Sequence, residues 1–203
     1  MSLISASIFR SYDIRGIVDR DLNEAVIEEI GRAIGSEART RGVSMLVLGR
    51  DGRLSGESLQ RALCQGLLHT GVEVIDIGCV PTPLLYFSAH ELAGGSGVML
   101  TGSHNPPDYN GIKIMLAGET LFGDAIQDLY RRTTQQDYCH GSGICRHEDV
   151  REEYLQQLAG RITLGRPLKV VVDGGNGVAG LTAPALLTRL GCEAVSYTHL
   201  TLP

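Results

Sequence analysis

Hydrophobic residues recur along the chain at two spacings, one typical of helices and the other of strands. Between residues 22 and 42, Val26, Ile30 and Ile34 lie four positions apart, which predicts an amphipathic helix. Asn23 is suited to cap its start and Gly42 to end it. Similar patterns predict helices at 55–70, 81–92 and 123–134, and strands at 45–48, 72–78, 97–100 and 111–115.

The predicted strand at 97–100, Gly-Val-Met-Leu, is apolar throughout instead of alternating. A continuous apolar strand is expected where both faces of a sheet are covered. Together with the alternation of strands and helices, this predicts an α/β fold. Its sheet should be mixed and mostly parallel, with helices on both faces.

A polar stretch at 135–148 interrupts the alternation and predicts a linker or a long loop. Beyond it come a helical pattern at 149–162, an apolar strand, a helix and the start of another strand. We therefore expect a first domain over 1–140 and the start of a second α/β domain over 141–195. With only two strands, that second sheet should expose an open edge and an uncovered apolar face.

Composition and charge exclude some classes of function. The chain has 43% hydrophobic and 20% charged residues, typical of a globular protein. Its net charge is -5 and it has no basic run, so neither a nucleic-acid surface nor a polybasic membrane anchor is indicated. No apolar stretch is long enough to span a membrane, and the five cysteines form no CxxC pair. We expect a soluble protein of a reducing compartment, the cytoplasm.

The segment Thr-Gly-Ser-His-Asn-Pro-Pro directly follows the buried strand at 97–100. Its prolines should make 102–107 a rigid loop at the carboxyl end of that strand, the edge where α/β sheets bind ligands. Ser103 is placed as a nucleophile would be, yet it lies in no G-x-S-x-G elbow, and on extended backbone His104 would point to the opposite face. Acyl transfer is disfavoured and phosphoryl transfer favoured; a rigid turn with a capping serine is the alternative.

Positive charge is available close by in the sequence. The Asn-Gly pair at 110–111 predicts a tight turn that folds the strand 111–115 back beside the loop. On that strand Lys113 takes the face opposite Ile112 and Ile114, so it either enters the site or lies on an exposed edge.

Two other loops, FRSYDIRG and GRDGR, carry a pair of arginines each. An arginine beside a helix N-terminus suits an anion, so both loops are candidates for a phosphate site. The alternative is an ordinary ion pair in each, Arg15 with Asp13 and Arg53 with Asp51.

Gly175, Gly177 and Gly180 form a literal G-x-G-x-x-G between a strand and a helix, as in dinucleotide-binding proteins. The acidic residue expected at the end of the next strand is missing, since Glu193 lies near its start. A tight strand-to-helix turn is the simpler interpretation, and a dinucleotide-dependent oxidoreductase is an alternative.

The segments FRSYDIRG, GRDGRLSGESL, GVMLTGSHNPPDYNGIKIM and VVVDGGNGVAG resemble, in order and spacing, the α-D-phosphohexomutase family. The resemblance covers residues 8 to about 195, and TGSHNP is most similar to the phosphomannomutase/phosphoglucomutase branch. It implies the interconversion of hexose 1-phosphate and hexose 6-phosphate, of mannose or glucose.

The resemblance also implies roles for particular residues. Ser103 corresponds to the serine that carries the phosphoryl group and gives one oxygen to a bound Mg²⁺. His104, Lys113 and Arg15 correspond to catalytic residues, and Tyr12 and Arg15 to residues of the substrate cleft. Ser103 would pass its phosphoryl group to the sugar phosphate, giving a hexose 1,6-bisphosphate that turns over and returns its other phosphate.

Three parts of the family pattern have no match here: its aspartate-rich metal loop, its sugar-recognition loop and its C-terminal phosphate-binding domain. Residues 196–203 do not resemble the family's continuation. We therefore expect an N-terminal fragment with a non-native tail over 196–203 and negligible mutase activity by itself. A non-catalytic phosphosugar-binding module is the alternative, and a phosphatase that uses Ser103 is a further one.

Overall fold

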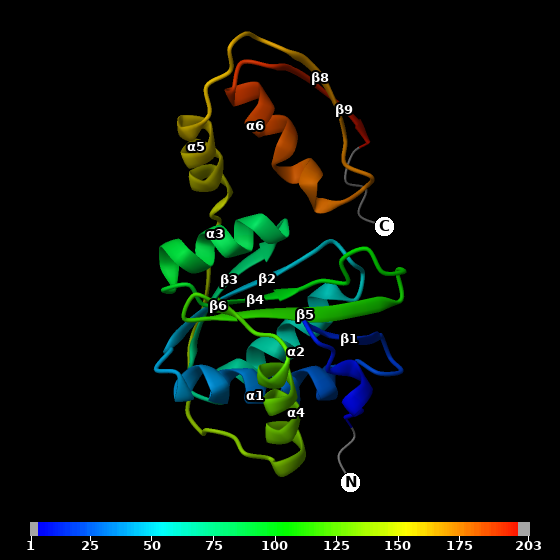
Figure 1. Ribbon diagram of the computed structural model, residues 1–203, viewed down its shortest axis with the longest axis vertical. Helices are drawn as coiled ribbons and strands as arrows, with labels where there is room; N and C mark the ends of the chain where they lie inside the picture. The colour runs from blue at the N-terminus through cyan, green and yellow to red at the C-terminus, as the bar shows by residue number, and fades with distance from the viewer. Residues whose placement is uncertain (1–3, 199–203) are drawn as a thin grey trace.

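A computed structural model describes residues 4–198 of the chain. It has a larger α/β body, followed by a smaller unit that begins at helix α5 (Figure 1). Within the expected tail 196–203, residues 196–198 complete the last strand, and 199–203 lie outside the described residues.

A seven-stranded sheet forms the centre of the larger body, in the order β1-β5-β4-β2-β3-β7 with β6 paired to β5. Strand β5 pairs antiparallel with β1, β4 and β6, whereas β2 pairs parallel with β3 and β4, and β3 with β7. Only β5 therefore runs against the others, and the predicted mixed, mostly parallel sheet is confirmed. The strands are β1 (Ile14–Ile17), β2 (Met45–Arg50), β3 (Glu73–Cys79), β4 (Gly97–Leu100), β5 (Tyr109–Leu116), β6 (Glu119–Thr120) and β7 (Cys145–His147).

Helices cover both faces of this sheet, as predicted (Figure 1). On one face lie α1 (Glu24–Thr40), α2 (Gly56–Leu68) and α4 (Asp124–Gln135), and on the other α3 (Thr82–Leu92). The first face buries the larger core, which includes Ile30, Leu48 and Leu63. The second core lies under α3 and includes Val47 and Met99. Neighbouring strand residues thus enter opposite cores, as the two-residue period of a strand requires. A short 3-10 helix, η1 (Ala6–Ile8), precedes β1.

The predicted ends of α1 are confirmed. The Asn23 side chain accepts a hydrogen bond from the Val26 amide at 3.0 Å, which satisfies one of the free amides of the first turn. Gly42 follows the helix with φ +75, in the left-handed region that glycine adopts most easily.

The prediction of a tight turn at Asn110 and Gly111 is wrong. Both residues lie inside β5, where Gly111 faces Arg15 of β1, and the chain reverses in the loop 101–108 instead. Gly111 is needed for packing, because a Cβ atom there would lie 2.5 Å from the carbonyl oxygen of Ile14. The buried Asn110 side chain donates to Ser55 Oγ at 3.0 Å.

The polar stretch 135–148 is more ordered than its composition predicts. It contains β7, which pairs with β3 and extends the sheet to His147. Before that strand, the amides of Gly141 and Gly143 donate to the carbonyls of His69 and Leu68 at 2.9 and 2.8 Å. The stretch is thus held along the end of α2, and the domain boundary at residue 140 stays a prediction.

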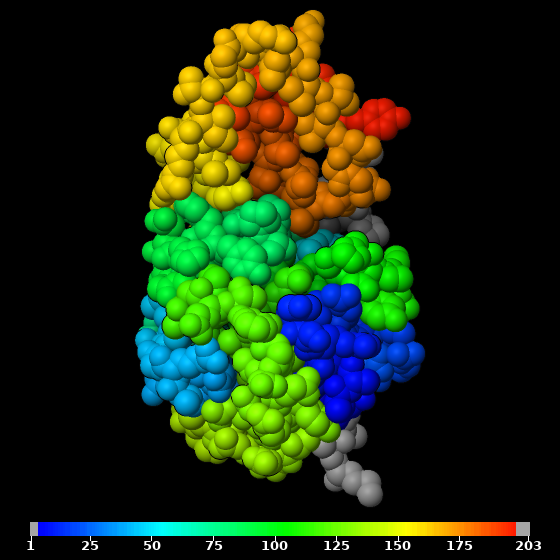
Figure 2. Space-filling view, viewed as in Figure 1, coloured from blue at the N-terminus to red at the C-terminus, as the bar shows by residue number. Residues whose placement is uncertain are grey.

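The smaller unit contains α5 (Arg151–Arg161), β8 (Lys169–Asp173), the short 3-10 helix η2 (Val178–Leu181), α6 (Ala183–Arg189) and β9 (Glu193–Thr198). Strands β8 and β9 form a two-stranded parallel sheet that α6 contacts. Val171, Val195 and Tyr197 are 71%, 57% and 75% exposed, so the predicted uncovered apolar face is confirmed. Figure 2 shows this unit resting on α3 of the larger body. At this contact the rings of Phe87 and Tyr154 lie 5.2 Å apart.

Candidate active site

Two loops meet at the carboxyl edge of the sheet. Strands β2 and β4 are parallel neighbours in which Arg50 faces Leu100, so the segments that follow them leave the sheet side by side. The segment after β2 contains Asp51 and Arg53, and the segment after β4 contains Ser103. This is the edge at which α/β sheets bind ligands, as the sequence predicts.

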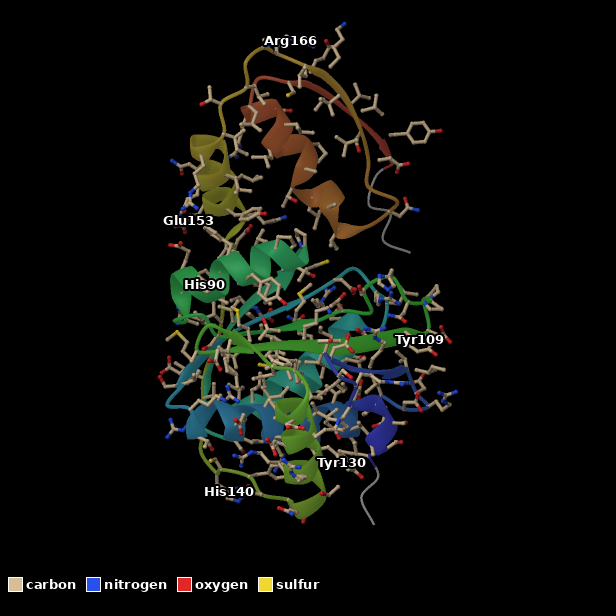
Figure 3. The ribbon with its side chains drawn as sticks, in the orientation of Figure 1. His90, Tyr109, Tyr130, His140, Glu153 and Arg166 are labelled. Carbon is tan, nitrogen blue, oxygen red and sulfur yellow. The ribbon has the colours of Figure 1, made fainter. Side chains whose placement is uncertain are left out.

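The Arg53 side chain holds the serine loop in place. Its Nη1 atom donates to the carbonyl oxygens of Pro106 and Tyr109 at 2.5 and 2.9 Å, and its Nη2 atom to those of Ser103 and Asn105 at 3.1 and 2.7 Å. Tyr109 begins β5 at the right-hand edge of Figure 3. The Arg53 side chain is only 13% exposed, and the loop itself uses its donors. Arg53 therefore shapes the loop instead of offering a free anion site.

Asp51 forms the second support of the loop. Its Oδ2 atom accepts hydrogen bonds from the Thr101 hydroxyl at 2.7 Å and the Gly102 amide at 3.2 Å, and its Oδ1 atom accepts one from the Arg53 amide at 3.1 Å. The Thr101 hydroxyl in turn accepts from the Ser103 amide at 2.9 Å. The Asp51 carboxylate thus helps to fix the backbone that leads into Ser103, and it acts on the Ser103 amide through the Thr101 side chain.

Ser103 has φ +52, the left-handed region that residues with a side chain rarely adopt. The predicted rigid loop is present, but the expectation of extended backbone at this residue is wrong. A left-handed residue persists only where its surroundings hold it, and here Arg53 and Asp51 supply those contacts. Both Ser103 and its neighbour His104 are exposed.

A cavity of about 580 Å³ opens beside Ser103. Asp51, Leu54 and Pro107 contribute to its walls, and Thr82 contributes from the start of α3. The opposite wall is the glycine loop Gly175–Val178 of the smaller unit. The turn that contains the G-x-G-x-x-G pattern thus lies opposite the serine loop. The sequence pattern alone did not indicate this placement.

Arg15 and Lys113 meet at one buried carboxylate. Asp13 Oδ2 lies 2.5 Å from Arg15 Nη2 and 3.7 Å from Lys113 Nζ. Arg15 Nη1 also donates to the Asn105 side chain at 3.4 Å, which connects this pair to the serine loop. The alternative of an Arg15–Asp13 ion pair is therefore realised, and it is the contact that holds Arg15 next to the loop. Tyr12 is 74% exposed and lines the adjacent hollow of about 460 Å³ together with Arg15 and Asn105.

The structure brings most, but not all, of the sequence-predicted residues together. Tyr12, Arg15, Ser103 and Lys113 lie at one edge of the sheet, whereas Arg50 lines a separate cavity on the side of α5. The supporting residues Asp51, Thr101 and Asn105 were not singled out as functional from the sequence. The available signal was the aspartate that directly follows the buried strand β2.

A complete magnesium site does not fit the residues present. Mg²⁺ prefers six oxygen ligands in an octahedron, usually with one or two carboxylates. Over residues 4–198, no three His, Cys, Asp or Glu side chains gather as a metal site, and the carboxylate of Asp51 is engaged by Thr101 and Arg53. We therefore derive no step through a metal ion.

Among the described helices, none is long and apolar enough to cross a membrane.

Comparisons with known proteins agree with this geometry. A family model described as phosphoglucomutase/phosphomannomutase, alpha/beta/alpha domain I, matches residues 6–139. The phosphomannomutase/phosphoglucomutase of Pseudomonas aeruginosa is 52% identical over 192 residues, which are 95% of this chain and 42% of that enzyme. The phosphoglucomutase of Neisseria meningitidis serogroup B is 45% identical over 193 residues, with 94% and 42% covered.

A solved structure of a phosphoglucomutase/phosphomannomutase family protein from Burkholderia thailandensis superimposes with a TM-score of 0.91 at 50% identity. It covers 96% of this chain, and the match takes in 44% of that protein. The chain therefore spans less than half the length of the relatives that it matches. Because the family model alone covers more than half of the 203 residues, the chain belongs to the phosphoglucomutase/phosphomannomutase family and contains its α/β/α domain I.

Proposed function

We propose that the chain carries the phosphoryl-transfer part of a phosphohexomutase, with Ser103 as the residue that holds the phosphoryl group. The observation that carries this proposal is the exposed Ser103 on a loop held by Arg53 and Asp51 beside a cavity. A serine that both gives and receives a phosphoryl group must present its oxygen in one geometry, and a fixed loop provides that.

The neighbouring charges suit the same reaction. Arg15 and Lys113 lie around Asp13, at the side of the serine loop where Asn105 contacts Arg15. Cations stabilise the negative charge that spreads over a phosphoryl group during transfer. We assign them this role, and we assign to the exposed His104 the transfer of a proton at the reacting hydroxyl. Tyr12 and Arg15 would contact the bound sugar phosphate.

The proposed substrates are the 1- and 6-phosphates of glucose or mannose. Phosphorylated Ser103 passes its phosphoryl group to the free hydroxyl of the sugar phosphate, and the Ser103 oxygen leaves with a proton restored to it. The resulting hexose 1,6-bisphosphate turns over in the site and returns its other phosphate to Ser103. The names of the Pseudomonas and Neisseria relatives support this class of substrate. Such sugar phosphates are soluble metabolites, and we place the reaction in the cytoplasm.

The family typically uses Mg²⁺, and we propose that the phosphorylated Ser103 would offer it one oxygen. When bound, the ion would supply positive charge to the phosphoryl group. The other ligands are not gathered among the described residues, so binding to this chain should be weak.

The chain spans 42% of the length of the Pseudomonas relative. We propose that its turnover is negligible. A second candidate function is the binding of a phosphosugar without transfer, which the cavity beside Ser103 supports equally well.

The test is incubation of the purified chain with glucose 1,6-bisphosphate that carries labelled phosphate, followed by peptide mapping. Label on Ser103, absent in the S103A variant, supports phosphoryl transfer. Saturable binding without label supports the second candidate, and release of inorganic phosphate would indicate a phosphatase. A chain that neither binds nor takes up label contradicts both proposals. Conversion of glucose 1-phosphate to glucose 6-phosphate by the chain, above that of S103A purified identically, would contradict negligible turnover.

A further inference from the structure

Two cysteines far apart in the sequence lie at the contact between α2 and β7. Cys64 belongs to α2 and is 8% exposed, whereas Cys145 begins β7 at the edge of the sheet and is exposed. Both are free thiols. Neither belongs to the serine site, so the chemistry of this pair is independent of the proposed function.

The register of β7 directs the Cys145 side chain toward α2. Cys145 faces Val74 of the neighbouring parallel strand β3, and residues opposite each other on paired strands extend to the same face. Val74 and Cys64 belong to the same core, between the sheet and α2. The side chain of Cys145 therefore lies on the face of the sheet that carries Cys64.

The two residues also lie at the same level along α2. The Gly143 amide donates to the Leu68 carbonyl at 2.8 Å, which places Gly143 beside the last residue of the helix. From Gly143, β7 runs parallel to β3. Helix α2 precedes β3 and leads to its start, so α2 runs in the direction opposite to both strands. The two residues from Gly143 to Cys145 advance about 6.6 Å, and the four residues from Leu68 back to Cys64 cover about 6 Å along α2. Cys145 and Cys64 therefore lie at a similar position along the helix axis.

The thiols differ in their surroundings. Burial raises the pKa of the Cys64 thiol to about 12, and the neighbouring Cys145 thiol acts in the same direction. Cys64 is therefore the protonated, protected member of the pair, and Cys145 the member that solvent reaches.

We propose that Cys64 and Cys145 form a reversible disulfide when the protein meets a peroxide. The exposed Cys145 sulfur attacks one peroxide oxygen, the O–O bond breaks, and Cys145 becomes a sulfenic acid as one water leaves. The Cys64 sulfur then attacks the Cys145 sulfur, its proton passes to the departing hydroxyl, and a second water leaves. Two thiols lose two electrons and two protons, and hydrogen peroxide becomes two waters.

The bond would tie α2 to the segment that leads from the larger body into α5. That segment contains His140, labelled at the foot of Figure 3. Backbone hydrogen bonds and strand pairing hold it against α2 and β3, and Nδ1 of His147 lies 3.3 Å from Oδ2 of Asp76 on β3. A cross-link between positions 64 and 145 closes a long loop of chain, which restricts the unfolded state and stabilises the folded one.

The experiment treats the reduced chain with hydrogen peroxide, blocks the remaining thiols and measures the intact mass and the cross-linked peptides. We expect the loss of two hydrogens, two fewer blocked thiols, and a peptide that joins Cys64 to Cys145. The C145S and C64S variants should lose this product, and C139S, which removes another exposed cysteine, should keep it.

The oxidised chain should also melt at least about 4 °C higher than the reduced one, a shift that C145S should lack. Because Cys145 is exposed, C145S is expected to fold, which keeps the test valid if C64S does not. Addition of oxygen without cross-linking, a bond to Cys139, or a dimer linked between chains would overturn the proposal.

Discussion

Arg53 donates a hydrogen bond from Nη2 to the backbone carbonyl oxygen of Ser103 at 3.1 Å, across 50 positions of sequence. The same guanidinium reaches three other carbonyls of the loop. A planar fork of donors can satisfy four acceptors in this way, whereas an ammonium group cannot reproduce the geometry. The conformation of the candidate nucleophile therefore depends on a side chain from the neighbouring strand's loop.

Replacing Arg53 with lysine should loosen the serine loop. We expect R53K to lower the free energy of unfolding by about 1.5–3 kcal/mol, because four carbonyls of the loop lose charged donors. Amide exchange over residues 101–109 should speed up severalfold in hydrogen-exchange mass spectrometry. R61K is the matched control, since Arg61 is 73% exposed on α2 and pairs with the exposed Glu57. Unchanged exchange in R53K would mean that the loop holds its shape without the clamp.

The Thr101 hydroxyl links Asp51 to Ser103, because it donates to the Asp51 carboxylate and accepts from the Ser103 amide. The T101V variant keeps the shape of the side chain but removes one donor to the Asp51 carboxylate and the acceptor of the Ser103 amide. We expect a loss of about 1–3 kcal/mol of stability and slower uptake of label at Ser103. T101S retains the hydroxyl and should stay close to the original chain in both measurements. Equal losses in T101V and T101S would assign the effect to the methyl group instead.

Much of this fold could be predicted because local patterns and tertiary packing agree. Val26, Ile30 and Ile34 point one face of α1 into the core, and Asn23 caps that helix where the pattern starts. The position of Ser103 at a ligand-binding edge followed from a buried strand and the loop directly after it. These features depend on residues close together in the sequence.

Features that depend on distant partners could not be predicted. Asn110 and Gly111 have the composition of a turn, but their roles are set by Ser55 and by the Ile14 carbonyl across the sheet. Strand β7 lies in a polar segment without periodicity, because its pairing needs only backbone groups. The glycine loop at 175–178 belongs to a dinucleotide-like spacing, yet its place opposite Ser103 is decided by how the smaller unit rests on the larger body.

Gly111 offers a direct test of that packing. In G111A the new Cβ atom would lie 2.5 Å from the Ile14 carbonyl oxygen and 3.2 Å from that of Thr101, so two strands would have to separate. We expect a loss of about 1–3 kcal/mol of stability by denaturant unfolding. The control is G160A in α5, where no atom lies within 4 Å of the new Cβ. Alanine favours helix, so G160A should be unchanged or more stable by up to about 1 kcal/mol. Similar stabilities for the two variants would refute the packing role of Gly111.

Glu37 links α1 to α4 in the larger body. Its Oε2 atom accepts hydrogen bonds from Nε and Nη2 of Arg132 at 3.2 and 3.1 Å, and its Oε1 atom accepts one from Arg41 Nε at 2.8 Å. Burial alone would raise the pKa of Glu37, but the two arginines outweigh it, and the pKa lies below its ordinary value of 4.5.

The stability that Glu37 contributes should therefore depend on pH in one direction. Because its pKa is lower in the folded than in the unfolded chain, the contribution is fully present above about pH 4.5 and is lost as the pH falls through the folded value. E37Q should be about 1–3 kcal/mol less stable than the original chain at pH 7, and the gap should narrow below pH 4. Urea unfolding over this range measures both. E57Q, which removes an exposed pair with Arg61, should differ by less than about 1 kcal/mol throughout. A gap for E37Q that stays constant down to pH 3 would show that packing of the side chain, and not its charge, joins the two helices.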